Sequence, residues 1–373
     1  MTTEILDFNS KLLQPTMREW LTYYVRHRTA TGPIIVEFDP TTTCQMTCPE
    51  CISGSLLNQG YISSERTLEL IDEFKLVGVQ GVIFIGGGEP LAHKCMPVPI
   101  RKCHDLGLAV GLTTNGLLIE RYLSDIAECV SWTRVSVDAA NQKTFSLFRP
   151  SQVVESFSRV IRGMDLLGRS KVGLLGYSFL LMERRNGSGF VTNIPELYEA
   201  ARLARELGCD YFEYKPAVDA DHNLIPLSDT SRRSLVEQIL MMAGLATDTF
   251  KVLAPQSVQH LLDGVSVEQP KNYRTCPTLE LRTVVTPSGV YPCPYKRGHQ
   301  EVKLAETNMP FGDAWNSSDR RAKALAINPS TDCRFYCIRH DTNSLLLSLA
   351  DAYDNGVNLL PYMLFQDSGD VFV

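Results

Sequence analysis

The sequence predicts an α/β protein, with a partial TIM-like (β/α)6 barrel of parallel strands followed by a small hairpin-plus-helix domain. Between residues 33 and 216, short apolar runs alternate with segments of helical periodicity, an order typical of a parallel sheet with helices packed outside it. After Pro216 the alternation ends, and a second group of cysteines lies around a hairpin pattern. These two observations define the fold class.

Six strand–helix units account for the barrel. An amphipathic helix over 10–28 precedes them, and a helix near 229–243 follows them. Helix 195–207 has clear ends, because Pro195 suits a first helical turn and Gly208 lies just past the last one. The expected strands are 33–38, 82–85, 108–114, 132–138, 172–182 and 210–215, and the expected helices between them are 68–77, 96–106, 119–129, 151–167 and 195–207.

Changes of pattern divide the chain into five segments. The barrel begins with the apolar run at Pro33 and ends at Pro216, where the sequence becomes polar and irregular. The cysteine-bearing part begins at Cys276. The expected segments are an N-terminal helical extension (1–32), the barrel (33–216), a helical connection (217–275), the cysteine-bearing domain (276–340) and a C-terminal helix and tail (341–373).

Composition and charge exclude several classes of protein. The chain has 373 residues, 44% hydrophobic and 21% charged, as expected for a folded globular protein. With 36 Lys and Arg against 42 Asp and Glu, its net charge of −6 argues against a nucleic-acid scaffold. The N-terminus carries Glu4, Asp7 and Lys11 where a signal sequence needs apolar residues, and no apolar stretch approaches about 18 residues. We therefore expect a cytoplasmic protein that contacts no membrane.

Three cysteines, Cys44, Cys48 and Cys51, follow the first expected strand on a short loop. Such thiolates can ligate three irons of a cubic iron–sulfur cluster and leave the fourth iron open to another ligand. A structural zinc site is the alternative, but it needs four ligands, and no further cysteine lies within about 40 residues. The nearby His27 lies before the strand, at its opposite end.

This spacing, Cys-x3-Cys-x2-Cys, resembles the signature of the radical S-adenosylmethionine (SAM) superfamily. The segment GGGEP, residues 86–90, follows the second expected strand and resembles the GGE motif of the same superfamily. The resemblance implies that the cysteines hold a [4Fe-4S] cluster, that SAM chelates its open iron, and that Gly87, Gly88 and Glu89 help to bind the SAM amino group. One position departs from the pattern: the residue before the last cysteine is often aromatic and packs on adenine, whereas here it is Glu50.

Three further segments look like the parts of this superfamily that contact the ribose and carboxylate of SAM. They are TTNG (113–116), SVDA (136–139) and FRP (148–150). A satisfied polar strand end is the structural alternative for Ser136 and Asp138, and a solvated arginine is the alternative for Arg149. The resemblance makes Thr113, Asn115, Ser136, Asp138 and Arg149 candidate SAM contacts.

A second set of cysteines, Cys276, Cys293, Cys333 and Cys337, lies in the C-terminal part. A hairpin turned at 287–289 separates the first two, and four thiolates on so small a unit make a closed metal site. Structural zinc is one interpretation. The order of cysteine, hairpin, cysteine, helix and cysteine pair also resembles the twitch module, the shortened relative of the SPASM domain. That resemblance implies one auxiliary [4Fe-4S] cluster, whereas a full SPASM domain would need more cysteines.

Three residues are candidates for the chemical step or for contact with substrate. Glu213 and Lys215 share the inner face of the last expected barrel strand, although an internal ion pair would explain them equally well. Cys95 follows GGGEP on the expected rim of the site and is a candidate hydrogen-atom donor. A buried structural thiol is the alternative for Cys95.

The resemblance covers residues 34–340 and implies a radical SAM oxidoreductase. In this superfamily a reduced cluster passes an electron to SAM, and the 5′-deoxyadenosyl radical that results removes a hydrogen from the substrate. A closed auxiliary cluster can accept the second electron. We therefore expect dehydrogenation of a small hydroxylated substrate, an amino-sugar or cyclitol-like natural-product intermediate, with flavodoxin or ferredoxin as the kind of electron donor.

Three other functions stay open on the sequence. An epimerase would return a hydrogen atom from a thiol, for which Cys95 is the candidate. A maturase of ribosomally made peptides is the second alternative, although no leader-binding domain precedes residue 33 and polar strand ends favour a small molecule. An iron–sulfur carrier without catalytic activity is the third, and it would need no SAM pocket.

Overall fold

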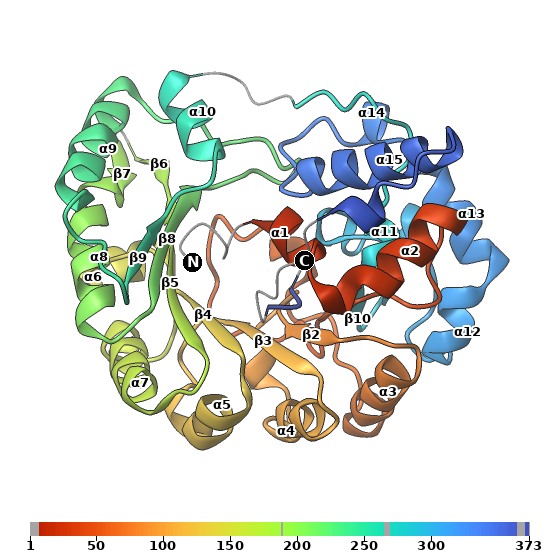
Figure 1. Cartoon of the computed structure of the whole chain (residues 1–373). Helices are drawn as coiled ribbons and strands as arrows, with labels where there is room; N and C mark the ends of the chain where they lie inside the picture. The colour runs from red at the N-terminus through yellow and green to blue at the C-terminus, as the bar shows by residue number, and fades with distance from the viewer. Residues whose placement is uncertain (1–6, 188, 265–268, 364–369, 373) are drawn as a thin grey trace.

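The computed structural model describes residues 7–187, 189–264, 269–363 and 370–372. Nine of its strands form one sheet in the order β11-β10-β1-β2-β3-β4-β5-β8-β9. Neighbouring strands are parallel except for the hairpin of β10 and β11. The sheet curves into a barrel that stays open, because its edge strands β11 and β9 do not pair with each other in the described part of the chain (Figure 1). The predicted fold class is confirmed.

Each of the six expected strands is present. They are β1 (Ile35–Phe38), β2 (Gly81–Phe84), β3 (Ala109–Thr114), β4 (Trp132–Ser136), β5 (Leu174–Leu181) and β8 (Tyr211–Pro216). Side chains alternate between two environments along these strands. Val36, Phe38, Val110 and Leu112 have no exposed surface and belong to the main hydrophobic core, whereas Glu37 belongs to the lining of an internal cavity. The alternation leaves the polar side chains facing the lumen.

Helices cover the outside of this sheet (Figure 1). Side-chain caps fix the start of three of them: Ser63 accepts a hydrogen bond from Arg66 N at 3.1 Å, Asn141 one from Thr144 N at 3.1 Å, and Ser228 one from Ser231 N at 3.2 Å. The outer helices are α3 (Ser64–Leu76), α4 (Val98–Asp105), α5 (Leu123–Cys129), α6 (Gln142–Phe148), α7 (Ser156–Ser170), α8 (Leu197–Glu206) and α9 (Asp229–Met242).

Helices from both ends of the chain lie side by side at one end of the barrel (Figure 1). They are α1 (Phe8–Leu12), α2 (Arg18–His27) and α15 (His340–Asp354). Leu12, Leu21 and Leu346 are fully buried there and share one hydrophobic cluster with Ile35 and Ile83 of the barrel. This cluster closes the end of the barrel opposite the cysteine loop.

The C-terminal module continues the barrel sheet. Its hairpin consists of β10 (Arg282–Thr286) and β11 (Gly289–Tyr291), and β10 pairs in parallel with β1 so that Val284 lies opposite Glu37. The hairpin prediction is confirmed. The other elements of the module are α11 (Thr278–Leu281), α12 (Phe311–Asn316), α13 (Ser318–Ala326) and α14 (Pro329–Asp332).

The structure adds elements that the sequence pattern did not indicate. The segment expected as a helical connection contains β9 (Lys251–Leu253), which pairs in parallel with β8, and α10 (Ser257–Asp263). A small hairpin of β6 (Glu183–Asn186) and β7 (Gly189–Thr192) follows β5. These strands have only three or four residues and, unlike β1 and β2, no extended apolar run, so only pairing with a neighbour defines them.

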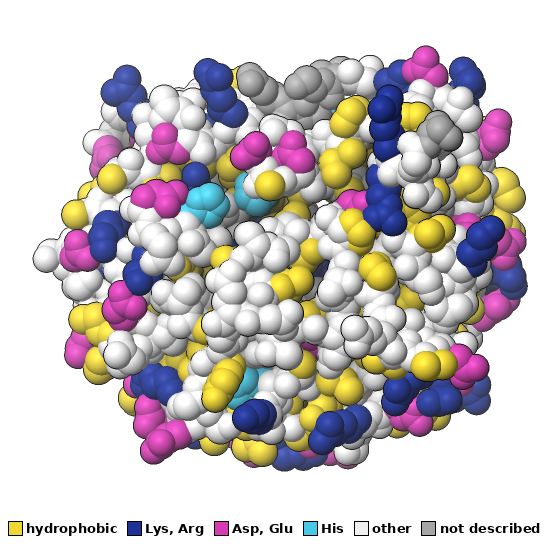
Figure 2. Space-filling view, turned by 180° about the vertical axis from the view of Figure 1, so that it is seen from behind, with side chains coloured by type: hydrophobic (Ala, Val, Ile, Leu, Met, Phe, Trp, Pro, Cys, Tyr) yellow, Lys and Arg dark blue, Asp and Glu magenta, His cyan; other side chains and the backbone are white. Residues whose placement is uncertain are grey.

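Charges of both signs are spread over the surface. On the face in Figure 2, basic and acidic side chains alternate around the rim, while uncharged side chains and backbone occupy the middle. This mixture is what the modest net charge of −6 predicts. Within the described ranges, no helix is both long and apolar enough to cross a membrane.

Candidate active site

A first cavity, of about 160 Å³, lies at the carboxyl ends of β1 to β4, where parallel barrels bind their ligands. The cysteine loop after β1 forms one wall and the glycine loop after β2 another. The structure thus brings together most of the residues predicted to bind the first cluster and SAM. The predicted residues in its lining are Cys44, Cys48, Cys51, Gly87, Gly88, Glu89, Thr113, Asn115, Ser136 and Arg149.

The glycine loop packs against the backbone of the cysteine loop. A Cβ on Gly88 would lie 2.4 Å from the carbonyl carbon of Thr42, closer than side chains ever approach backbone, so only glycine fits. The next residue, Glu89, donates its N–H to the carbonyl of Thr43 at 2.8 Å. Gly87 is less crowded, since its Cβ would lie 3.3 Å from Thr42 Cγ2. The two loops therefore form one unit around the cavity.

Glu89 joins this unit to β3. Its carboxylate is buried and accepts hydrogen bonds from Asn115 N at 2.6 Å, Thr114 Oγ1 at 2.7 Å and Leu91 N at 3.1 Å. Burial raises the pKa of Glu89 to about 7, and these hydrogen bonds oppose the rise. The carboxylate fixes the ends of β2 and β3 relative to each other before any ligand is bound.

Arg149 places a positive charge beside the cysteine loop. Its guanidinium contacts Asp138 through Nε at 2.7 Å and Nη2 at 2.5 Å, and its Nη1 lies 3.9 Å from Cys48 Sγ. Asp138 also accepts a hydrogen bond from Leu180 N at 2.7 Å and lies outside the cavity lining. Asp138 thus orients Arg149, while Arg149 faces the cavity.

The donor set of the first cavity fits an anionic iron–sulfur cluster. Burial raises the pKa of Cys48 to about 11, and the charge of Arg149 opposes this rise and so favours the thiolate that binds iron. Asn115 Nδ2 lies 3.7 Å from Cys44 Sγ and can stabilise a second thiolate. Three thiols, an adjacent cation and a glycine-lined hollow meet the needs of a cluster and a small ligand.

Glu50, the departure from the aromatic pattern, is engaged elsewhere. Its carboxylate lies 3.5 Å from Arg184 Nη1, and the Arg184 guanidinium lies over the ring of Phe148 at 5.2 Å from the centroid. The residue before the last cysteine of the loop therefore makes an ion pair to β6.

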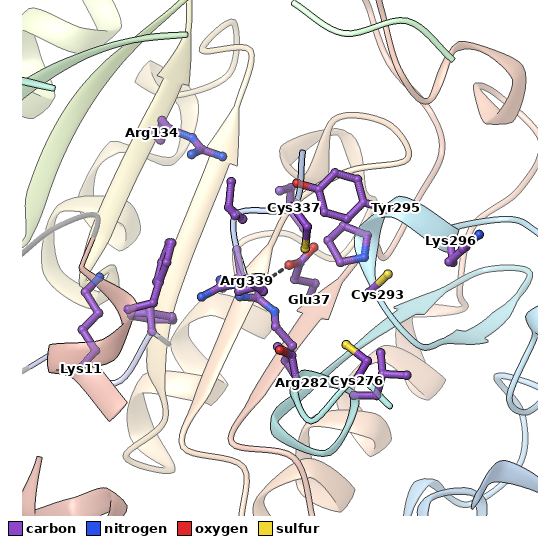
Figure 3. Close-up of a pocket in the computed structure, with 18 of the residues that line it drawn as sticks. Lys11, Glu37, Arg134, Cys276, Arg282, Cys293, Tyr295, Lys296, Cys337 and Arg339 are labelled. Carbon is purple, nitrogen blue, oxygen red and sulfur yellow. Dashed lines mark hydrogen bonds and ion pairs between the residues drawn. The ribbon is translucent and has the colours of Figure 1, made fainter. Parts of the chain in front are cut away.

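A second cavity, of about 280 Å³, lies deeper in the lumen, between the barrel wall and the C-terminal module (Figure 3). Ile85, at the end of β2, lines both cavities, so they lie on either side of the same residue. Apolar side chains make up much of the wall. The lining includes all four module cysteines, Cys276, Cys293, Cys333 and Cys337, together with Ile83, Trp132, Leu174, Tyr211 and Phe335.

The module thiols are buried among positive charges. Burial raises the pKa of Cys333 and of Cys337 to about 11, and Lys271 opposes the rise at both thiols. Asn343 Nδ2 of α15 lies 3.4 Å from Cys276 Sγ. Among the described residues, no group of three His, Cys, Asp or Glu is arranged to hold a single metal ion. Cations and an amide donor around four thiols fit an anionic cluster.

A chain of buried charges joins the module to the barrel. Arg297, in the loop after Cys293, pairs with Asp39 of the segment after β1 and lies 3.5 Å from Glu37 of that strand. Arg282 of β10 also pairs with Glu37. Sequence reasoning missed Arg297, because nothing in the local pattern indicates that it reaches across to β1.

Comparison with known proteins agrees with this geometry. The model of the Radical SAM superfamily matches residues 38–184, which begin at the last residue of β1 and span the cysteine loop, the glycine loop and β2 to β5. The chain carries a radical SAM domain. Proteins of this superfamily use SAM and a [4Fe-4S] cluster. All residues that line the first cavity belong to the matched range.

Curated relatives cover the radical SAM domain to different extents. An AdoMet-dependent heme synthase from Methanosarcina barkeri is 27% identical over 181 residues, which are 48% of this chain and 48% of that protein. The chain thus spans about half the length of this relative, and less of several others. The mycofactocin maturase MftC of Mycobacterium tuberculosis is 23% identical over 299 residues, 77% of this chain and 71% of that protein.

Solved structures extend the likeness from the radical SAM domain to the module. SuiB of Streptococcus suis, in complex with S-adenosylmethionine, has a TM-score of 0.61 at 14% identity and covers 95% of this chain and 80% of its own. The anSMEcpe structure with AdoMet and Cp18Cys peptide has a TM-score of 0.55 at 13% identity, covering 88% of this chain and 99% of its own. At such low identity the likeness shows the fold.

The candidate substrate residues are placed differently around the radical SAM domain. Glu213 lines the second cavity and accepts from Lys215 Nζ at 3.2 Å and Arg134 Nη1 at 3.4 Å. Lys215 lines neither of the two cavities described above. Arg134 was missed, although the period of two along β4 places it on the same face as Ser136.

Cys95 also lies outside the lining of both cavities. Its thiol is 3.0 Å from His93 Nδ1, and His93 Nε2 is 2.7 Å from the carbonyl oxygen of Ile62. The carbonyl can only accept, so Nε2 carries the ring proton and Nδ1 accepts from the thiol. The geometry therefore favours the structural alternative for Cys95 over hydrogen-atom donation.

Proposed function

We propose that the chain is a radical SAM enzyme that oxidises its substrate in the second cavity. One observation carries the proposal: this cavity extends from Ile85, which also lines the first cavity, to the four thiols of the module. A molecule bound there lies between the site where a radical is formed and a site that can take an electron. An iron–sulfur carrier would need neither cavity.

The two cofactor sites supply complementary chemistry. SAM bound at a cluster on Cys44, Cys48 and Cys51 supplies a 5′-deoxyadenosyl radical, and a cluster on the module cysteines supplies an acceptor for one electron. A substrate carbon that bears a hydroxyl becomes a ketone when it loses a hydrogen atom, a proton and an electron. The atoms and charges then balance without a further oxidant.

The residues of this chain bind and orient SAM and the substrate, and they exclude water from the reaction. Gly87 and Gly88 let backbone line the SAM site, and Glu89, Asn115 and Ser136 stay as proposed SAM contacts. The apolar wall of the second cavity keeps water away from a reactive intermediate, as radical chemistry requires.

The substrate class has two candidates. A hydroxylated small molecule, of the amino-sugar or cyclitol kind, is the first, since a cavity of about 280 Å³ is near the lower limit for a small-molecule site. A peptide is the second, because the match to the maturase MftC covers 77% of this chain, and SuiB has also been solved bound to its precursor peptide SuiA. Electron delivery by flavodoxin or ferredoxin and a cytoplasmic location are parts of the proposal.

Anaerobic turnover tests this function. Protein reconstituted with iron and sulfide is incubated with SAM, a reductant and either a panel of sugars and cyclitols or a candidate precursor peptide, and 5′-deoxyadenosine is measured by mass spectrometry. We expect one substrate class to raise 5′-deoxyadenosine formation above the rate without substrate. Formation that no panel member changes, in protein with a full iron content, would contradict the proposed small-molecule and peptide classes.

A further inference from the structure

The second cavity is rich in bases, and its acids are already paired. Five bases and three acids line it. Arg282 pairs with Glu37, Lys11 lies 2.7 Å from Asp370, and Lys215 lies 3.2 Å from Glu213. The bases are Lys11, Arg134, Arg282, Lys296 and Arg339, and the acids are Glu37, Glu213 and Asp370. None of these acids is left over for a substrate amine.

Some of the basic side chains near the cavity act electrostatically on the module thiols. The charges of Lys296 and Lys271 oppose the rise of the pKa of Cys333, and those of Lys271 and Arg282 oppose it at Cys337. These three cations fit the negative charge of a bound cluster. Arg134 and Arg339 are not among the largest charge effects on these thiols.

Arg134 is weakly held on the barrel side of the cavity. Its contacts to Glu213 and to Thr113 Oγ1 are both 3.4 Å, at the long end for hydrogen bonds, and Lys215 is closer to the same Glu213 oxygen. Figure 3 shows Arg134 extending into the cavity from the barrel strands, on the side away from Cys276 and Cys293. Two basic side chains, Arg134 and Lys215, therefore share the single carboxylate of Glu213.

Arg339, just before α15, carries an unused donor. Its guanidinium lies over the Phe8 ring, 3.8 Å from the centroid, and its buried Nη1 has no hydrogen-bond partner within the described ranges. A buried guanidinium donor without an acceptor is unfavourable, so the geometry is suited to an acceptor supplied by a ligand.

We propose that the second cavity binds an anionic group of the substrate, a carboxylate or a phosphate, through Arg134 and Arg339. The inference rests on the proposed function and narrows its substrate class. An acidic sugar, a phosphorylated sugar or cyclitol, or a peptide carboxylate fits, whereas an amino sugar that offers only a free amine does not. The preference for amino sugars drawn from the sequence is thereby replaced.

Calorimetric titration of cluster-loaded protein with saturating SAM tests the inference. The probes are glucuronate, glucose 6-phosphate, glucose and glucosamine, which share one ring and differ in charge. We expect glucuronate or glucose 6-phosphate to bind at least about tenfold more tightly than glucose and glucosamine, because each charged hydrogen bond contributes strongly. The better of the two acids identifies the anionic group.

Variants locate the binding. Arg134→Gln and Arg339→Gln should each weaken binding of that acid by about tenfold or more, with iron content and SAM affinity retained. Arg169→Gln, a matched change at an exposed ion pair on α7, should leave it unchanged. Equal affinity in all three variants, no binding of either acid, or equally tight binding of glucosamine would overturn the inference.

The two proposals fail separately. Anion binding that depends on Arg134, in protein that forms no product from any substrate, contradicts the proposed function and leaves the anion site standing. If the protein oxidises a neutral substrate, and neither glucuronate nor glucose 6-phosphate inhibits that oxidation, the anion site is contradicted and the proposed function is retained.

Discussion

Arg297 of the C-terminal module and Asp39 after strand β1 form a buried ion pair, with Arg297 Nε 2.6 Å from Asp39 Oδ2. The same oxygen of Asp39 accepts a hydrogen bond from Gly87 N at 2.9 Å. Burial raises the pKa of Asp39 to about 7, and Arg297 opposes the rise and so favours the charged carboxylate. Arg297, in the loop that begins at Cys293, therefore contacts Asp39, and Asp39 contacts the glycine loop of the proposed SAM site.

The first prediction follows from this pair. Arg297→Met should lower the free energy of unfolding by about 3 to 5 kcal/mol, because Asp39 and Glu37 then lose a buried partner. The change should also weaken SAM binding, since Asp39 no longer fixes Gly87. Anaerobic denaturant titration and SAM titration measure the two effects.

Arg169→Met is the matched control, because Arg169 is exposed and pairs only within α7. It should change neither quantity. SAM affinity that is unaltered in Arg297→Met, at full iron content, would show that the module loop does not support the SAM site.

The second prediction concerns iron. The two cysteine sets should hold about eight irons per chain as two cubane clusters. Replacing Cys44, Cys48 and Cys51 by Ala should remove about half of this iron and all SAM cleavage. Cys95→Ala should retain the full content. Stoichiometric zinc together with the iron of one cluster would refute the auxiliary-cluster assignment.

The third prediction separates two neighbouring glycines. Gly87→Val should crowd the proposed SAM site and weaken SAM binding with less loss of stability than a change at Gly88, because the nearest atom to a Cβ there is the side-chain methyl Thr42 Cγ2, at 3.3 Å, and not backbone. Gly88→Ala should instead destabilise the protein by about 1 to 3 kcal/mol, since its Cβ would collide with the backbone at Thr42. Thermal unfolding and SAM titration distinguish these effects. Equal destabilisation by the two changes would mean that the loops are not packed as described.

Much of the fold could be predicted because the signals are local. The apolar run before Cys44, the helical spacing that ends at Gly78 and the end of helix α8 near Gly208 each depend on a few adjacent residues. The residues around the first cavity could also be found, because each follows a predicted strand directly and parallel strands bring their carboxyl ends to one edge of the sheet.

The missed features depend on contacts between distant segments. Arg297 meets Asp39 across 258 residues of sequence, and Asn343 meets Cys276 across 67. Strand β9 is defined only by pairing with β8. The pairing of Glu37 with Arg282 likewise appears only in three dimensions, whereas an ion pair of Glu213 and Lys215 was already one interpretation of the strand pattern.

The fate of the substrate hydrogen in deuterated buffer tests the central claim most directly. For any substrate that supports 5′-deoxyadenosine formation, oxidation predicts a product about two mass units lighter, free of solvent deuterium, with about one 5′-deoxyadenosine per product. An isomer of unchanged composition that carries one solvent deuterium, and that disappears in Cys95→Ala, would contradict the account.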